Sequence, residues 1–111
     1  MTEVTDEQMR ATLAQAKAYT VAILTSGPMK DRPDRAAIVW EHGRRNMALR
    51  AEGALPIVCP IRDDSSVHGI GIFARTVEET KAILDDDPGV RAGVFRYELH
   101  ACMGFPGSAL S

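Results

Sequence analysis

His42 could move protons near neutral pH, because imidazole titrates in that range without being perturbed. It lies near the middle of a segment, residues 34–52, whose apolar spacing predicts a helix. A nearby carboxylate would fix the tautomer of the ring, and Asp87, in an acidic turn before a proline, is the candidate partner. Such a pair serves either acid–base catalysis or a structural hydrogen bond between helix and sheet, and the residue types leave both open.

Other polar groups give weaker signals. The adjacent Arg44 and Arg45 could bind an anionic group of a substrate, although paired arginines on a helix more often face solvent. Asp63, Asp64 and His68 could hold a metal ion, but one imidazole and two turn carboxylates make a loose ligand set. A solvated hairpin turn explains these residues better, so we predict no metal site.

A glycine pattern in the second half of the chain resembles a cofactor motif. Residues 69–74 read GIGIFA, which matches the dinucleotide pattern G-x-G-x-x-A. That pattern requires a strand before the first glycine and a helix that opens through it. Here a polar turn precedes the glycines, which lie inside a predicted strand. We therefore reject the match and predict no cofactor.

The composition excludes several classes of partner. The chain has 111 residues, a hydrophobic fraction of 45% and a net charge of −2, which give no electrostatic reason to expect nucleic acid or an anionic membrane. No apolar run approaches the ~18 residues that would span a bilayer, and the polar, acidic N-terminus is unlike a secretory signal. Cys59 and Cys102 lack metal-ligand spacing, which favours reduced thiols. We expect one domain over residues 1–111, located in the cytoplasm.

Hydrophobic periodicity and turn residues predict seven elements. They are a helix at about 6–17, a strand at 19–25, a helix at 34–52, strands at 54–59 and 68–75, a helix at about 77–86, and a strand at 92–102. Thr5 and Thr76 begin capping-box sequences, and Gly53 is expected to end the long helix with a positive φ. The second of these capped helices is predicted to end in the acidic turn before Pro88, where carboxylates oppose the helix dipole.

After the N-terminal helix the predicted order is β-α-β-β-α-β, which is typical of an α+β ferredoxin-like fold. Right-handed crossovers put both helices on one face of a four-stranded antiparallel sheet, with the first and third strands in the centre. Pro56 in the second strand agrees with an edge position. The uncovered face carries apolar residues, so we expect a second copy of the chain to cover it as a homodimer. Antiparallel packing of the two helices would bring His42 and Asp87 to the same end of the sheet.

Several stretches between residues 18 and 101 resemble the YCII-related (YciI-like) family. They are YTVAILTSGP, the histidine eleven residues before Gly53, GALPIVCP, a DD pair followed by GIGIF, VEETKAIL, and DDDPGVRAGVF. The stretch DPGVRAGVF is the most specific of these. The resemblance implies a dimeric α+β barrel in which two ferredoxin-like sheets face each other.

The same resemblance implies an active site made of a histidine and an aspartate. On this sequence the two match His42 and Asp87, and Asp64 falls at a position that is often acidic in the family. Cys59 departs from the pattern, since the family usually has glycine before this proline. The resemblance therefore does not extend to the shape of the pocket near Cys59.

Two classes of function are compatible with these residues. In the first, the protein is a small-molecule enzyme in which His42 and Asp87 catalyse a cofactor-independent isomerisation or elimination, and Asp64 and Arg45 bind the substrate. In the second, it is a non-catalytic dimeric binding or accessory domain whose His–Asp pair is structural. A cleft that holds the pair would favour the enzyme, and a packed seam would favour the binding domain.

Overall fold

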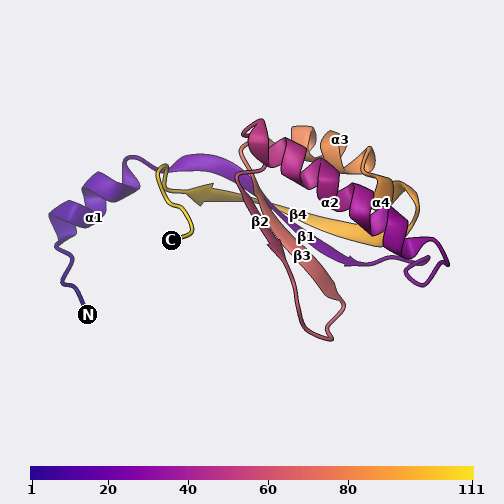
Figure 1. Cartoon of the computed structure of the whole chain (residues 1–111). Coiled ribbons are helices and arrows are strands. Elements are labelled where there is room, and N and C mark those ends of the chain that lie inside the picture. Colours follow the sequence, from indigo (N-terminus) through magenta and orange to yellow (C-terminus); the bar gives the residue numbers. More distant parts are fainter.

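A four-stranded antiparallel sheet and the helices along one of its faces form the body of the protein (Figure 1). The computed structural model describes all 111 residues. Its elements are α1 (Asp6–Leu13), β1 (Lys17–Ser26), α2 (Arg35–Ala51), β2 (Ile57–Pro60), β3 (Val67–Phe73), α3 (Val77–Asp85), α4 (Pro88–Arg91) and β4 (Phe95–Gly104). None of the helices combines the length and the apolar composition that crossing a membrane would need.

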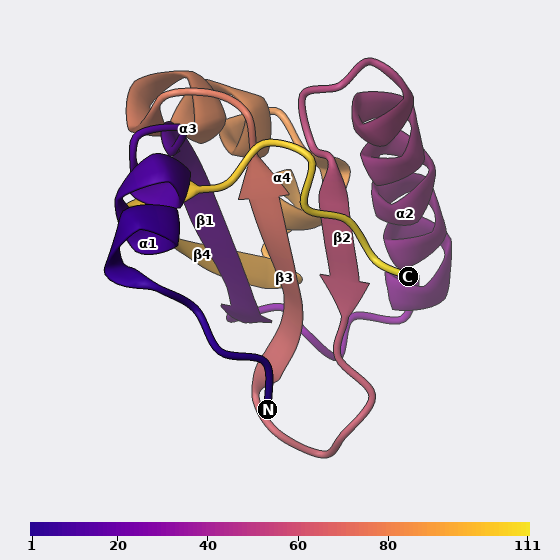
Figure 2. The same cartoon turned by 90° about the vertical axis from the view of Figure 1, so that its left-hand side faces the viewer.

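The strand order β2-β3-β1-β4 confirms the predicted ferredoxin-like arrangement. β1 lies in the centre and pairs with β4 from Lys17 opposite Gly104 to Ser26 opposite Phe95. On its other side β1 pairs with β3, and the short β2 pairs with β3 at the edge (Figure 2). Pro56 lies just before this edge strand, where its missing N–H interrupts no ladder.

Helices α2, α3 and α4 cover the same face of the sheet, as the predicted crossovers require (Figure 1). The core lies between them and the strands and consists of Ala22, Leu24, Leu55, Phe73, Leu84, Val94 and Phe95. On the opposite face Val21, Ile23 and Ile72 are only partly buried, and Ile70 is 37% exposed. This chain therefore leaves one apolar face of its sheet without a covering layer.

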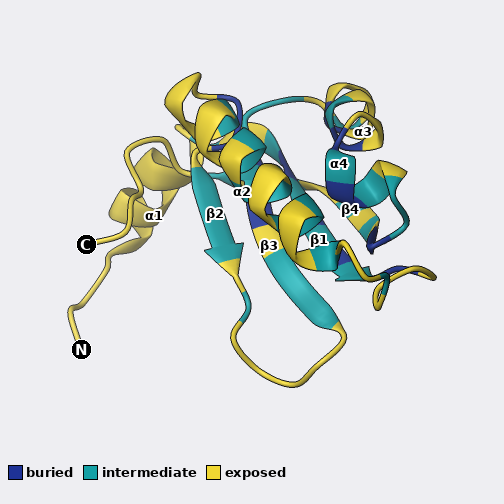
Figure 3. Ribbon diagram, turned by 45° about the vertical axis from the view of Figure 1, so that its right-hand side comes forward, coloured by how far each residue is buried: buried dark blue, intermediate teal, exposed yellow.

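The N-terminal helix differs from the prediction in length and in packing. It begins with the expected capping box at Thr5 but ends at Leu13, because Lys17 is already paired with Gly104 in the β1–β4 ladder. No residue of α1 is buried; Met9 and Leu13 are each 47% exposed. Figure 3 shows the helix exposed along its length, beyond the end of the sheet. Its apolar spacing predicted a buried face, and the rest of this chain provides no surface against it.

Two predicted strands begin later than expected. Residues 54–56 are not strand: the backbone N–H groups of Ala54 and Leu55 both donate to the carbonyl of Leu49 and close the end of α2. Both side chains are buried there, so the apolar pattern was correctly assigned to the core but not to a strand. The last strand begins at Phe95 because the preceding residues form α4 and its turn.

Gly53 has φ of +81°, which confirms the predicted left-handed end of α2. A Cβ at this position would meet nothing within 4 Å, so Gly53→Ala tests only the cost of holding alanine at a positive φ. We expect the free energy of unfolding to fall by about 1 kcal/mol. Gly43, in the middle of α2, also faces open space, and there the same change should raise stability by up to about 1 kcal/mol because alanine favours the helix. Urea unfolding checks both; a shift of the same sign in the two variants would contradict the account.

Candidate functional site

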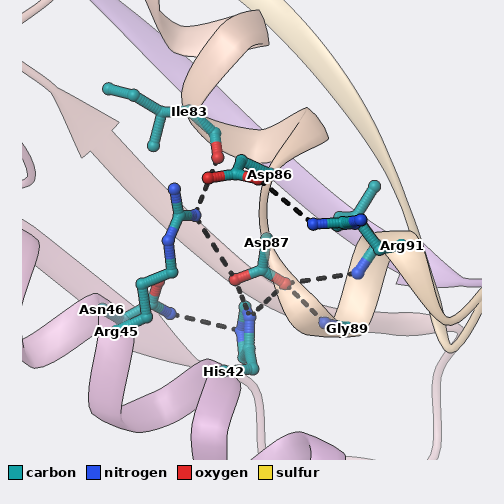
Figure 4. Close-up of polar contacts among 9 residues, drawn as sticks. His42, Arg45, Asn46, Ile83, Asp86, Asp87, Gly89 and Arg91 are labelled. Carbon is teal, nitrogen blue, oxygen red and sulfur yellow. Dashed lines mark hydrogen bonds and ion pairs between the residues drawn. The ribbon is translucent and has the colours of Figure 1, made fainter.

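His42 and Asp87 are in direct contact. Nδ1 of His42 lies 2.8 Å from Oδ2 and 2.9 Å from Oδ1 of Asp87 (Figure 4). The histidine side chain is 12% exposed, whereas that of Asp87 is completely buried behind it. Because the Nδ1–H donates to the carboxylate, Nε2 of the neutral ring carries the lone pair. Nδ2 of Asn46, one turn further along α2, lies 3.2 Å from this Nε2.

Asp87 lies just past the end of α3, as predicted, but it is also the N-cap of the next helix, α4. Its carboxylate accepts hydrogen bonds from the backbone N–H groups of Gly89 (2.9 Å) and Val90 (3.2 Å), and so caps the single turn α4. For Asp87 the predicted conflict with a helix dipole is therefore wrong, since its carboxylate lies at a helix N-terminus, whereas Asp85 and Asp86 do lie at the C-terminal end of α3. The signal was present in the sequence: Asp followed by Pro is a common start of a helix, with Pro at the first position.

The surroundings of Asp87 keep it ionised. Burial raises the pKa of its carboxyl, but the hydrogen bond and charge of His42 and the N–H groups of Val90 and Gly89 outweigh burial and hold the pKa below its usual value. Arg45 adds a cation, with Nη1 3.7 Å from Oδ1. The same Nη1 donates to the carbonyl of Ile83 at 2.7 Å, which ties α2 to α3. The Arg45 side chain thus contacts Asp87 and the backbone of α3.

A cavity of about 340 Å³ lies between α2 and strands β2 and β3. We call it the α2 cavity; it is lined by 20 residues, most of them apolar. They are Ala22, Leu24, Arg35, Val39, His42, Gly43, Asn46, Met47, Leu55, Val58, Cys59, Pro60, Ile61, His68, Gly69, Ile70, Gly71, Phe73, Leu84 and Phe95. The volume is in the range of small-molecule sites. His42 therefore faces a cavity on one side and a buried carboxylate on the other.

His68 is a second histidine in the wall of this cavity, although its place in the sequence suggested only a member of a loose metal-ligand set. Its Nε2 lies 2.7 Å from the hydroxyl of Ser26. The ring of Phe95 lies close to both imidazoles, with its centroid 4.9 Å from that of His42 and 5.4 Å from that of His68. Two imidazoles with different partners thus border one apolar space.

A β-bulge explains why strand alternation did not reveal His68. Simple alternation along β3 would put it on the open face with Ile70 and Ile72. The pairing with β1 skips one residue, since Leu24 is opposite Gly69 but Thr25 is opposite Val67. A bulge re-aims the side chain of the extra residue. No pattern of residue types marks this irregularity in the sequence.

The environment of His68 favours its neutral form. Burial, and then the positive charges of Arg35 and Lys30, lower the pKa of this histidine. We expect a ring titration by NMR to give a midpoint below about 6.5, the ordinary value. The unfolded chain binds the proton of His68 more tightly than the folded protein does. The contribution of neutral His68 to the free energy of unfolding is therefore complete above about pH 6.5 and is lost as the pH falls below that value. A midpoint at or above that value would contradict this description.

Asp64 lies apart from the His–Asp pair. It is exposed in the loop between β2 and β3 and lines a separate polar depression. That depression is bordered by Ser26, Lys30, Asp31, Arg35, Asp64, Ser65, Ser66 and His68. Only Arg35 and His68 line both this depression and the α2 cavity. Of the four predicted site residues, His42, Asp87 and Arg45 come together and Asp64 does not. The structure contains no group of three His, Cys, Asp or Glu side chains placed to hold a metal ion.

Comparison with known proteins identifies a likeness of fold. No protein-family model matches the chain. No curated protein matches it either. Among solved structures, it is similar to 5-chloro-2-hydroxyhydroquinone dehydrochlorinase from Burkholderia phenoliruptrix AC1100, in complex with 2,5-dihydroxybenzoquinone, with 15% identity and a TM-score of 0.50. The similarity covers 74% of this chain and 90% of the dehydrochlorinase chain, so the two proteins share the small α+β architecture.

Proposed function

We propose that this protein is a small-molecule enzyme in which His42, oriented by Asp87, transfers protons to and from a substrate in the α2 cavity. The reaction would be a cofactor-independent isomerisation or elimination. The observation that carries the proposal is the two-sided position of His42, whose ring lines the cavity while its Nδ1 lies 2.8 Å from a fully buried carboxylate. A base with a fixed tautomer beside an apolar space is what proton abstraction requires.

Each polar group has a distinct task in this proposal. Nε2 of His42 takes the proton, and the Asp87 carboxylate stabilises the imidazolium that forms. Arg45 holds Asp87 and the end of α3 in place, and so acts through the carboxylate. Asn46 positions Nε2 until a substrate displaces its amide. Asp64 would contact only a substrate long enough to reach the polar depression.

The comparisons support this proposal at the level of fold. The dehydrochlorinase that this chain resembles in structure acts on a small ring compound, and its structure is a complex with another, 2,5-dihydroxybenzoquinone. Together with the motifs quoted above, the shared architecture supports membership of the YCII-related family. The two free thiols, Cys59 and Cys102, support a reducing cytoplasmic location.

We further propose that two copies assemble through the open sheet face as a dimeric α+β barrel. The partly buried Val21, Ile23 and Ile72 and the exposed Ile70 support this assembly. A specific interface should bury at least about 1,200 Å² in total. We expect sedimentation to show a dimer at micromolar concentration and Ile70→Lys to shift it toward monomer. A wild-type monomer at that concentration would contradict the assembly.

A second candidate function is a non-catalytic binding domain with a structural pair. It is favoured by the complete burial of Asp87 and by its two backbone hydrogen bonds, which serve the fold without any substrate.

Hydrogen exchange at carbon distinguishes the two candidates. Small ring carbonyl compounds, including 2,5-dihydroxybenzoquinone, are incubated with the protein in D2O, and loss of their C–H signals is followed by NMR. The enzyme proposal expects exchange faster than in buffer for compounds that enter the cavity. Compounds that bind in the cavity without any acceleration would favour the binding domain.

A further inference from the structure

Arg35 is the one permanently charged side chain in the wall of the α2 cavity. The other ionisable groups there are His42, His68 and the thiol of Cys59, and no aspartate or glutamate lines the space. Asp87 lies behind His42 and is absent from the wall. The ionic character of the cavity is therefore positive at one end and otherwise neutral.

The guanidinium of Arg35 makes no hydrogen bond or ion pair within the chain. By contrast, Arg32 binds Asp34 and Arg45 binds Ile83 and Asp87, so the neighbouring arginines that hold the fold together have partners. Arg35 is partly buried at the first turn of α2 and is one of the residues that line the largely apolar α2 cavity. A guanidinium has five N–H donors and matches a carboxylate in geometry, so this one has binding capacity that the protein itself does not use.

His68 and Phe95 complete this end of the cavity. With Ser26 bound at its Nε2, the neutral ring of His68 has a second nitrogen that can donate to an anion. Lys30 lies in the adjoining depression and adds positive charge, but Asp31 and Asp64 line the same depression and offset it. An anion is therefore favoured on the cavity side of His68, next to Arg35, and less so in the depression.

We propose that the α2 cavity binds a small, largely apolar acid, whose anionic group lies against Arg35 and His68 and whose ring packs on Phe95. The inference rests on the proposed function, because it names the substrate class for the same site. Arg35 and His42 are seven residues apart on α2, which separates their backbones by about 10 Å along the helix axis. The acid group is then held at one end while the reacting carbon lies near His42 at the other.

The test compares phenylacetate with its uncharged amide, 2-phenylacetamide, which has nearly the same shape. Dissociation constants are measured by NMR titration, with the backbone amides of Gly43, Gly69 and Gly71 as reporters, since all three line the cavity. We expect phenylacetate to bind at least about tenfold more tightly than the amide, because a hydrogen bond to a charged partner is roughly twice as strong as a neutral one. Arg35→Gln should abolish the difference, and Arg35→Lys should restore part of it.

Arg44→Gln is the matched control, because Arg44 is exposed on the same helix, pairs with Glu41 and does not line the α2 cavity. This variant should keep the full preference for the acid. Equal binding of the two probes by the wild-type protein, no binding of either, or a preference that survives Arg35→Gln would overturn the inference.

His42→Gln separates this inference from the proposed function. It should remove hydrogen exchange at carbon while leaving the preference for phenylacetate in place. If the preference is found but the wild-type protein accelerates no exchange, the acid site stands and the proton-transfer function fails. If exchange depends on His42 but the two probes bind equally, the proton-transfer function stands and the acid site fails.

Discussion

Replacing His42 by glutamine is expected to slow protein-catalysed exchange at carbon by about 100-fold or more, the usual contribution of a general base. Glutamine has similar length and can still donate a hydrogen bond to Asp87, but it cannot accept and release a proton near pH 7. The fold should therefore remain, with a melting temperature close to that of the wild-type protein. NMR exchange rates and thermal unfolding measured on the same samples check both parts.

Met47→Leu is the matched control, because Met47 lines the same cavity but has no ionisable group. Its exchange rate should stay within a few-fold of the wild-type rate. If His42→Gln keeps the wild-type rate and instead lowers the melting temperature, the pair is structural and the second candidate function holds.

Asp87→Ala is expected to lower the free energy of unfolding by about 3 kcal/mol or more, the effect of removing one member of a buried charge pair. The carboxylate is fully buried and binds His42 and the N–H groups of Gly89 and Val90. Its removal leaves those donors without an acceptor and α4 without a cap. Asp87→Asn should cost less, because its amide oxygen can still cap α4.

Asp86→Ala is the control for this prediction, since the neighbouring carboxylate is 72% exposed. It should change stability by no more than about 0.5 kcal/mol. A similar, small effect of Asp86→Ala and Asp87→Ala in urea unfolding would contradict the role given to Asp87.

The same carboxylate predicts how stability depends on acid. Its pKa is lower in the folded protein than in the unfolded chain, so the folded state binds this proton less tightly. The contribution of Asp87 is therefore complete above about pH 4, the unfolded value, and is lost as the pH falls through the lower folded value. The free energy of unfolding, measured between pH 2 and pH 6, should depend less on pH for Asp87→Asn than for the wild-type protein.

The sequence predicted the fold because its signals are local and agree with one another. Each signal specifies one helix boundary or one edge of the sheet. The signals are the capping boxes at Thr5 and Thr76, the glycine that ends α2 at Gly53, and Pro56 just before the edge strand. Once the element order was known, handedness rules left a single sheet arrangement, and the structure confirms it.

Other features depend on contacts that residue patterns do not encode. The bulge that turns His68 toward the helices comes from the register between β1 and β3, which is a property of two strands together. The position of α1 depends on which other surface packs against its apolar residues. The Asp-Pro pair indicated that Asp87 caps a helix, but the preceding acidic residues also fitted the end of a helix. The contact between His42 and Asp87 was predicted from helix packing, and the cavity beside it was not.

The most direct test of proton transfer by His42 is the tautomer of its ring, measured by 15N NMR of histidine-labelled protein at a pH where the ring is neutral. A base that faces the cavity needs a protonated Nδ1, bound to Asp87, and an unprotonated Nε2. We expect that tautomer in the wild-type protein, and we expect the Nε2 signal to move when phenylacetate is added. A proton on Nε2 and a bare Nδ1 would contradict the account, because His42 would then have no lone pair to offer a substrate.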